Sequence, residues 1–229
     1  MTWVKICGIT NLEDAMVAVQ AGADALGFVF YDKSPRKVDP ETAREIVAQL
    51  PPHVEKMGLF VDESAEKIAS VADEVGLTAV QLHTDKKLRP QKQVTDKKVF
   101  LSLPAHTVTF AEEEKGLAWA SLFTFPENLA AILVDSAKVG GTGKAFDWYA
   151  IGPFIASVGR IYPIVVAGGL TPDNVAEAMR ILKPWGVDVS SGVEARPGKK
   201  DPEKVRAFVK AVRDADRSVA GRDPSLRSG

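Results

Sequence analysis

Short runs of apolar residues recur along the chain, and most are followed by a stretch with the 3.6-residue periodicity of an amphipathic helix. The runs are rich in β-branched residues and end at Gly, Ser, Asp or Pro, which is typical of buried strands. The pattern predicts eight strands, at residues 4–7, 25–30, 56–61, 79–83, 99–103, 131–135, 164–167 and 186–190.

The helices between these strands have recognisable starts. Asn and Ser side chains suit the N-cap position because their oxygen accepts a hydrogen bond from the first helical turn. Proline directly after an N-cap is also favourable, because it lacks only an N–H that this turn does not use. The predicted starts are Asn11, Asp39-Pro40, Ser64, Thr171-Pro172 and Asp201-Pro202. The lysine-rich region after residue 84 has the weakest pattern, and there we place a further helix at 111–123.

The alternation of strands and helices limits the fold. Strands joined by crossover helices cannot pair as hairpins, so the sheet is expected to be parallel and covered by helices. Eight such units predict a single-domain (β/α)8 TIM barrel over residues 1–217, followed by a polar, frayed tail at 218–229. A doubly wound open sheet is the alternative.

Composition narrows the class of protein. The 229 residues are 45% hydrophobic and 26% charged, as in a globular protein with a sizeable core. Lys and Arg total 29 against 30 Asp and Glu, so no global charge attracts nucleic acid or a membrane surface. The single cysteine, Cys7, excludes an internal disulfide framework and a structural zinc cluster. With neither a secretory leader nor a membrane-length apolar run, we expect a cytoplasmic protein.

Two glycine-containing strand ends indicate an anion site. Gly168 and Gly169 follow the seventh strand, and Ser191 and Gly192 follow the eighth. Loops at these two places commonly cradle a phosphate in barrel enzymes. A tight turn also explains a glycine pair, but the nearby helix start favours the phosphate site. The glycine-rich segment 140–144 lacks the spacing of a nucleotide P-loop, and we interpret it as a mobile loop over the site.

Other strand ends carry candidate chemistry. Cys7 is either a small buried hydrophobe or a reactive thiol whose pKa helix N-termini lower. Asp135 ends a buried strand, where a carboxyl is paired, caps a loop or takes part in chemistry. His83 is a candidate base or an orienting hydrogen-bond donor. Arg36 is predicted to be exposed on a loop, where it is solvated or binds a carboxylate. Asp188 is expected to hold the phosphate loop or its neighbours by hydrogen bonds.

Taken together, these segments resemble phosphoribosylanthranilate isomerase, a (β/α)8 barrel enzyme of tryptophan biosynthesis. The resemblance spans most of the chain, and its motifs occur in the family's order. They are Lys5-Ile6-Cys7-Gly8-Ile9-Thr10, Gly22-Ala23-Asp24-Ala25, Gly27-Phe28-Val29-Phe30, Ser34-Pro35-Arg36, Gln81-Leu82-His83, Val134-Asp135, Gly140-Gly141-Thr142-Gly143-Lys144, Phe146-Asp147-Trp148, Gly168-Gly169-Leu170 and Asp188-Val189-Ser190-Ser191-Gly192-Val193-Glu194. The chain departs from the family pattern at Thr84, where glycine is usual, and in the fifth strand, which lacks the usual Lys-Ala pair.

The resemblance implies an Amadori rearrangement of N-(5-phosphoribosyl)anthranilate to 1-(2-carboxyphenylamino)-1-deoxyribulose 5-phosphate, without metal or redox cofactor. It implies that Asp135 is the general acid, that Cys7 is the general base and that Arg36 binds the anthranilate carboxylate. Strands six and one are three steps apart in a closed barrel, so acid and base should face each other across the phosphosugar.

By the same resemblance, the phosphate would lie against the two glycine-containing strand ends, and the pocket would also contain two further side chains. The phosphate ligands would be Gly168, Gly169, Ser191 and Gly192. The pocket residues would be His83 and Asp188.

Two other functions remain open at this point. The histidine-pathway isomerase performs the same rearrangement with two aspartates, which Cys7 argues against. A non-catalytic barrel that binds phosphorylated ligands is the alternative from another class. The family contains monomers and dimers, so we expect a monomer or a homodimer.

Overall fold

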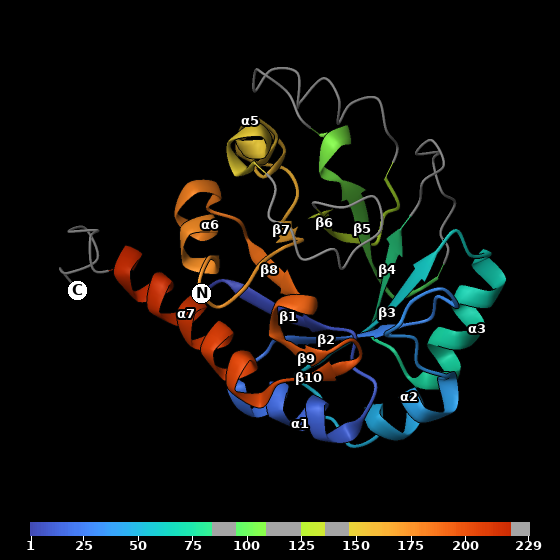
Figure 1. Ribbon diagram of the computed structural model, residues 1–229. Coiled ribbons are helices and arrows are strands. Elements are labelled where there is room, and N and C mark those ends of the chain that lie inside the picture. The colour runs from blue at the N-terminus through green and yellow to red at the C-terminus, as the bar shows by residue number, and fades with distance from the viewer. Residues whose placement is uncertain (84–94, 109–124, 136–146, 221–229) are drawn as a thin grey trace, which may run out of the picture.

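Eight parallel strands form a closed barrel in the computed structural model, which describes residues 1–83, 95–108, 125–135 and 147–220 (Figure 1). The strands follow one another around the barrel in chain order. They are β1 (Trp3–Cys7), β2 (Ala25–Val29), β3 (Glu55–Val61), β4 (Ala79–His83), β5 (Lys98–Pro104), β6 (Leu129–Asp135), β7 (Ile164–Ala167) and β8 (Gly186–Val189).

The pairing of β1 closes the barrel. β1 pairs with β2 on one side, where Cys7 is opposite Gly27, and with β8 on the other, where Lys5 is opposite Asp188. The predicted (β/α)8 barrel is therefore confirmed, and the open doubly wound sheet is wrong.

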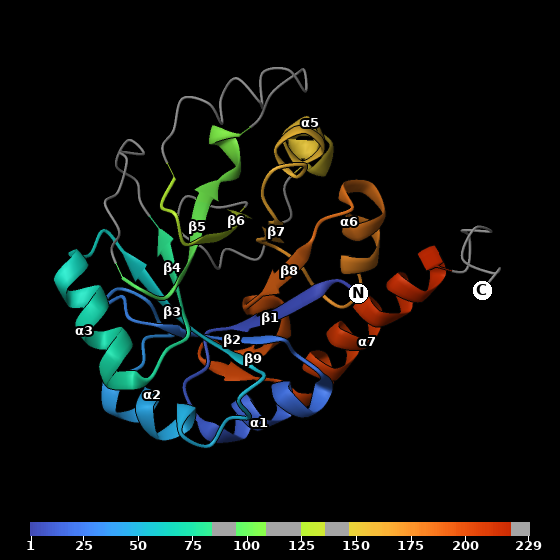
Figure 2. The same ribbon diagram turned by 180° about the vertical axis from the view of Figure 1, so that it is seen from behind.

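Helices cover the outside of the barrel, as both views show (Figures 1 and 2). They are α1 (Leu12–Ala21), α2 (Pro40–Val47), α3 (Ala65–Val75), α5 (Trp148–Val158), α6 (Val175–Leu182) and α7 (Pro202–Ala220). Two 3-10 turns, η1 (Ala105–Thr107) and η2 (Ser191–Val193), and a small antiparallel pair, β9 (Glu194–Arg196) and β10 (Lys199–Lys200), complete the described elements. The helix expected at 111–123 lies outside the described residues.

Most of the predicted helix starts are present. Asn11, Asp39 and Ser64 each accept a hydrogen bond from the backbone N–H three residues later, as N-cap side chains do. Asp201 accepts from the backbone of Glu203, at 2.9 Å, in the same way before α7.

The predicted start at Thr171-Pro172 is wrong. α6 begins at Val175, after Asn174. The Asn174 side chain accepts from the Thr171 backbone N–H at 2.7 Å and donates to the Gly169 carbonyl at 2.9 Å, so these residues form a turn before the helix. At the other end of the chain, α7 continues to Ala220, so the three residues after the expected boundary at 217 are helical.

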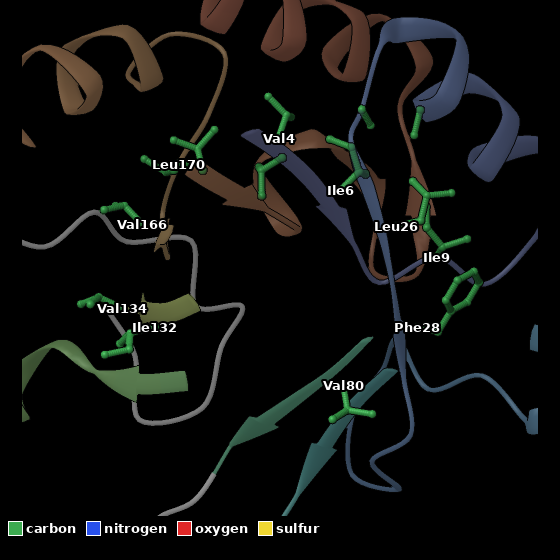
Figure 3. Packing of buried hydrophobic residues seen from close by; sticks show 14 of the residues in the cluster. Val4, Ile6, Ile9, Leu26, Phe28, Val80, Ile132, Val134, Val166 and Leu170 are labelled. Carbon is green, nitrogen blue, oxygen red and sulfur yellow. The ribbon is translucent and has the colours of Figure 1, made fainter. Parts of the chain in front are cut away.

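Strand residues alternate between two apolar regions. Side chains such as Val4, Ile6, Leu26 and Phe28 point outwards and pack under the helices (Figure 3). Burying one such side chain contributes roughly 1.5–3 kcal/mol, so this layer makes a large favourable contribution to folding.

A second, smaller cluster of buried hydrophobic side chains fills the interior of the barrel towards the N-terminal ends of the strands. Its members include Met57, Phe100 and Leu133, all nearly inaccessible to solvent, and Trp3 packs against them. The Trp3 ring stacks on Phe100 and on Trp185, with ring centroids 5.5 and 5.2 Å apart. This plug closes the N-terminal end of the barrel, so polar inward-facing side chains gather at the C-terminal ends of the strands.

Candidate active site

The C-terminal ends of the strands surround a hollow of about 870 Å³, its open mouth included. All nine residues that the sequence singled out for the site line this hollow. They are Cys7, Arg36, His83, Asp135, Gly168, Gly169, Asp188, Ser191 and Gly192.

Cys7 is the last residue of β1, and its thiol faces the neighbouring strand at a glycine. A Cβ atom placed on Gly27 would lie 2.7 Å from Cys7 Sγ and 3.0 Å from Lys5 Cε. Only a residue without a side chain therefore leaves room for both groups. Burial raises the pKa of the Cys7 thiol above its ordinary value, although the Lys5 ammonium acts in the opposite direction. The expectation of a lowered thiol pKa is thus wrong, because desolvation outweighs the positive charge nearby.

Lys5 lies two residues before Cys7 on the same inward face of β1. Its side chain is fully buried, and Nζ is 3.0 Å from Asp188 Oδ1. Burial acts to lower the pKa of Lys5, but Asp188 and Cys7 together raise it above the ordinary value. Asp188 therefore pairs with Lys5 inside the barrel, whereas the sequence predicted hydrogen bonds from Asp188 to the phosphate loop or its neighbours. Sequence reasoning missed Lys5, although a charge within an apolar strand was a visible signal.

Arg36 also differs from its expected position. It is only 8% exposed, and its guanidinium donates two hydrogen bonds to Glu194, from Nε to Oε1 and from Nη2 to Oε2, both 2.8 Å long. The hydrogen bonds to Glu194 raise the pKa of Arg36. The prediction of an exposed arginine is therefore wrong, because the segment after β8 covers it. These two bonds use two of the five guanidinium N–H groups, and the side chain still borders the hollow.

Glu194 holds a second buried cation. Lys200 Nζ is 3.1 Å from Glu194 Oε1, and its side chain is fully buried. Burial acts to raise the pKa of Glu194, but its hydrogen bonds and ion pairs with Arg36 and Lys200 lower the pKa below the ordinary value. The β9–β10 pair brings Glu194 and Lys200 to the same end of the barrel. Sequence reasoning did not assign a role to either residue.

The loops after β7 and β8 are in direct contact. Gly168 and Gly169 have φ angles of +83° and +68°, which few other residues adopt. A Cβ atom on Gly192 would lie 1.9 Å from the carbonyl oxygen of Leu170. The two glycine-containing strand ends therefore form one continuous backbone surface at the mouth of the hollow.

His83 is the last residue of β4 and has a polar neighbour on its own strand. Gln81 Nε2 and His83 Nε2 are 2.7 Å apart. Burial, with a smaller effect from the Lys5 charge, lowers the pKa of His83 to about 4. The ring is therefore neutral near pH 7, and a neutral imidazole can serve either as a base or as an orienting hydrogen-bond donor, the two roles predicted for it.

Asp135 ends β6 and is 8% exposed, with its side chain at the hollow. In the barrel order, β7 and β8 separate it from Cys7 on β1. A carboxyl and a thiol therefore border one space from different parts of its wall. The glycine-rich segment 140–144 that follows lies outside the described residues.

Within the described parts of the chain, no group of three or more His, Cys, Asp or Glu side chains is arranged to hold a metal ion. The same residues contain no helix both long and apolar enough to cross a membrane.

Comparison with known proteins identifies the family. The family model for N-(5'-phosphoribosyl)anthranilate isomerase matches residues 4–211, which include the eight strands except Trp3 and every residue that lines the hollow. The chain belongs to the phosphoribosylanthranilate isomerase family. The phosphoribosylanthranilate isomerase of Geotalea uraniireducens is 46% identical to it over 218 residues, which cover 93% of this chain and 99% of the relative.

Solved phosphoribosylanthranilate isomerases have the same fold. The crystal structure of the Thermotoga maritima enzyme has a TM-score of 0.77 and 41% identity, and covers 93% of this chain and 100% of its own. Another crystal structure, with a TM-score of 0.74 and 40% identity over the same coverage, is a complex with reduced 1-(o-carboxyphenylamino)-1-deoxyribulose 5-phosphate. The resemblance found in the sequence is confirmed, and the protein is an isomerase of this family.

Proposed function

We propose that this isomerase catalyses the Amadori rearrangement of N-(5-phosphoribosyl)anthranilate to 1-(2-carboxyphenylamino)-1-deoxyribulose 5-phosphate, by general acid–base catalysis within tryptophan biosynthesis. The observation that carries the proposal is that a thiol, a carboxyl, an arginine and a glycine-rich backbone surface all border one hollow. The ligand of the solved relative, a carboxyphenylamino sugar phosphate, has chemical groups that match this set.

The two anionic ends of the substrate would be held at opposite sides of the sugar. The backbone around Gly168, Gly169 and Gly192 suits the phosphate, because glycine allows N–H groups to approach its oxygens closely. The guanidinium N–H groups of Arg36 that do not bind Glu194 suit the anthranilate carboxylate. Anchoring both ends fixes the sugar between Cys7 and Asp135, which lowers the entropic part of the barrier.

The first chemical step would be ring opening. Protonated Asp135 gives its proton to the furanose ring oxygen, the bond from C1 to that oxygen breaks, and the nitrogen lone pair forms a C1=N iminium ion. The proton thus moves from the carboxyl to the new hydroxyl, and the carboxylate remains.

The second step would be proton removal at C2. The Cys7 thiolate takes the C2 proton, the C–H electrons form a C1=C2 bond, and the iminium π electrons return to nitrogen. The resulting enolamine gains a proton at C1 and loses one from its C2 hydroxyl, which gives the ketone. The cationic iminium beside Cys7 also favours the thiolate form.

The direct test is turnover by the purified full chain. Freshly prepared phosphoribosylanthranilate is fluorescent, and the proposal expects its fluorescence to decay in proportion to enzyme concentration, with the aminodeoxyribulose phosphate as the product. Tight binding without loss of fluorescence would instead support a non-catalytic phosphosugar sensor.

A further inference from the structure

Near the Cys7 thiol lies a group of five ionised side chains, here called the charge cluster, two of which also line the hollow. The cluster consists of Lys5, Arg36, Asp188, Glu194 and Lys200. Two ion pairs are buried in it, Lys5 with Asp188 at 3.0 Å and Lys200 with Glu194 at 3.1 Å, and Arg36 binds Glu194 as well. The cluster therefore contains three cations and two carboxylates, which leaves one positive charge in excess.

An excess of positive charge beside a buried thiol favours the ionised form of that thiol. Four of the five side chains act electrostatically on Cys7, namely Lys5, Arg36, Asp188 and Lys200. Among these charges the Lys5 ammonium has the largest effect on the pKa of the thiol, and the charges of Arg36 and Lys200 also act on it. A Cys7 thiolate would make the cluster neutral overall.

We propose that Lys5 is the counter-ion of the Cys7 thiolate and that Asp188 holds Lys5 in position for this role. Lys5 is a positioning residue in this scheme, because it acts on the substrate only through the sulfur of Cys7.

The geometry favours Lys5 over the other two cations. Lys5 Cε and Cys7 Sγ both lie over Gly27, at 3.0 and 2.7 Å from the position of a Cβ there, so the two atoms are within about 6 Å of each other. The charged Nζ atom is one bond beyond Cε, and an opposite charge within about 4–6 Å of a titrating group shifts its pKa by about 1–3 units. The other two cations, Arg36 and Lys200, share Glu194 as their carboxylate.

Charged and titratable groups on other elements also lie near the thiol. Asp188 on β8 disfavours the thiolate, since it is a like charge, and Lys200 on β10 favours it. His83 on β4 is neutral above about pH 4, and Asp135 on β6 borders the same hollow. Lys5 is therefore the group whose removal should have the largest effect on the thiol.

The single cysteine makes a direct measurement possible in the full chain. One probe is the rate of alkylation by iodoacetamide as a function of pH, in which the thiolate attacks carbon and iodide leaves. The second probe is the 13Cβ chemical shift of labelled cysteine, which needs no reagent to enter the hollow. The titration midpoint is the readout, because the plateau rate also changes with the basicity of the thiolate.

Three variants are expected to change the titration midpoint of the thiol in different ways. Lys5→Met should raise the midpoint by about 1–3 pH units. Asp188→Asn should lower it, because a like charge is removed while the amide oxygen still accepts from Lys5. Lys56→Met is the matched control: Lys56 is another largely buried strand lysine, bonded to the Pro51 carbonyl at 2.7 Å, and its loss should leave the midpoint unchanged.

Equal midpoints in Lys5→Met and Lys56→Met would overturn the proposal. If Lys5→Met does not fold, because Asp188 is left unpaired, the comparison is made between Lys5→Met/Asp188→Asn and Asp188→Asn alone. The double variant should then have the higher midpoint, and equal values would again refute the role of Lys5.

The link to catalysis rests on the proposed function, and the two can fail separately. If the wild-type chain turns over its substrate, the rising limb of kcat/KM against pH should move to higher pH in Lys5→Met, together with the titration midpoint of the thiol. Shifted midpoints in a wild-type chain that lacks turnover would reject the isomerase mechanism and retain the counter-ion. Normal wild-type turnover with unshifted midpoints would retain the isomerase mechanism and reject the counter-ion.

Discussion

The carboxylate of Glu194 binds the guanidinium of Arg36 through two parallel hydrogen bonds of 2.8 Å, although the two residues are 158 positions apart in the chain. The same carboxylate accepts from Lys200, whose side chain is fully buried. One acidic residue therefore compensates two buried cations. Arg36 can be presented to the hollow in a fixed orientation only while this arrangement is intact.

Removal of Glu194 should destabilise the protein strongly. Glu194→Ala leaves Lys200 and Arg36 without a counter-charge in the interior, and breaking a buried pair in this way typically costs about 3–5 kcal/mol. The measurement is urea unfolding followed by circular dichroism. Glu203→Ala is the control, because the Glu203–Arg206 pair is exposed and pairs of that kind contribute less than about 1 kcal/mol. Similar losses in both variants would contradict the importance of the buried carboxylate.

Each proposed catalytic group should be needed for turnover but not for folding. Cys7→Ala and Asp135→Asn should each lower kcat/KM by about 10²–10⁴-fold, the usual contribution of a proton transfer. Steady-state rates from the fluorescence decay test this, with circular dichroism and thermal unfolding as checks on the fold. Turnover close to wild type in either variant would remove that residue from the mechanism.

The contact between the two glycine loops should be necessary for binding the phosphate. In Gly192→Ala, the new methyl group would overlap the Leu170 carbonyl oxygen and force the loops apart. We expect KM to rise by about 10-fold or more and inorganic phosphate to inhibit less strongly, since removing good charge-assisted hydrogen bonds costs about 1.5–3 kcal/mol.

Gly152→Ala is the matched control for this experiment. Gly152 lies in α5, and a Cβ atom there would have nothing within 4 Å. Its kinetic constants should equal those of the wild type, and stability should rise slightly because alanine favours the helix. An unchanged KM in Gly192→Ala would argue against phosphate binding at these loops.

His83 should make stability depend on pH in weakly acidic solution. Burial, assisted by the Lys5 charge, lowers the pKa of His83 to about 4 in the folded chain, whereas an unfolded histidine titrates near 6.5. Between these values the unfolded state binds more protons, so the free energy of unfolding falls as pH decreases from about 6.5 to 4. The total decrease in the free energy of unfolding should be below about 3 kcal/mol, because the ring is partly in contact with solvent.

Urea unfolding at several pH values tests this effect. His83→Gln should show a shallower decline than the wild type, whereas His53→Gln, at an exposed position, should follow the wild-type curve. Parallel curves for all three proteins would show that His83 is not responsible.

The strands were predictable because burial of a strand determines which residue types occur along it. A strand covered on both faces must be apolar along its length, as Ile164–Ala167 illustrates. The start of α6 was less predictable: Thr171-Pro172 has the composition of an N-cap, but the Asn174 side chain satisfies the nearby backbone groups and forms a turn first. A local signal failed there because two polar side chains compete for the same role.

Part of the site was predictable for a similar reason. Cys7, His83 and Asp135 each end a strand, and in a parallel barrel all strand ends share one rim. The burial of Arg36 and the pairing of Asp188 were not predictable, because both depend on partners far away in the chain. Lys5 and Glu194 were missed because nothing in their local sequence states which charge compensates them.

The amino-acid sequence was sufficient to predict the alternation of strands and helices and the chemical groups at the strand ends, because periodicity and strand ends are local properties. The tertiary structure alone decided which charges meet. Lys5 and Asp188 are 183 residues apart in the chain, yet barrel closure places them opposite each other on β1 and β8. Electrostatic interactions depend on distance in space and on burial, and only the folded chain sets these quantities.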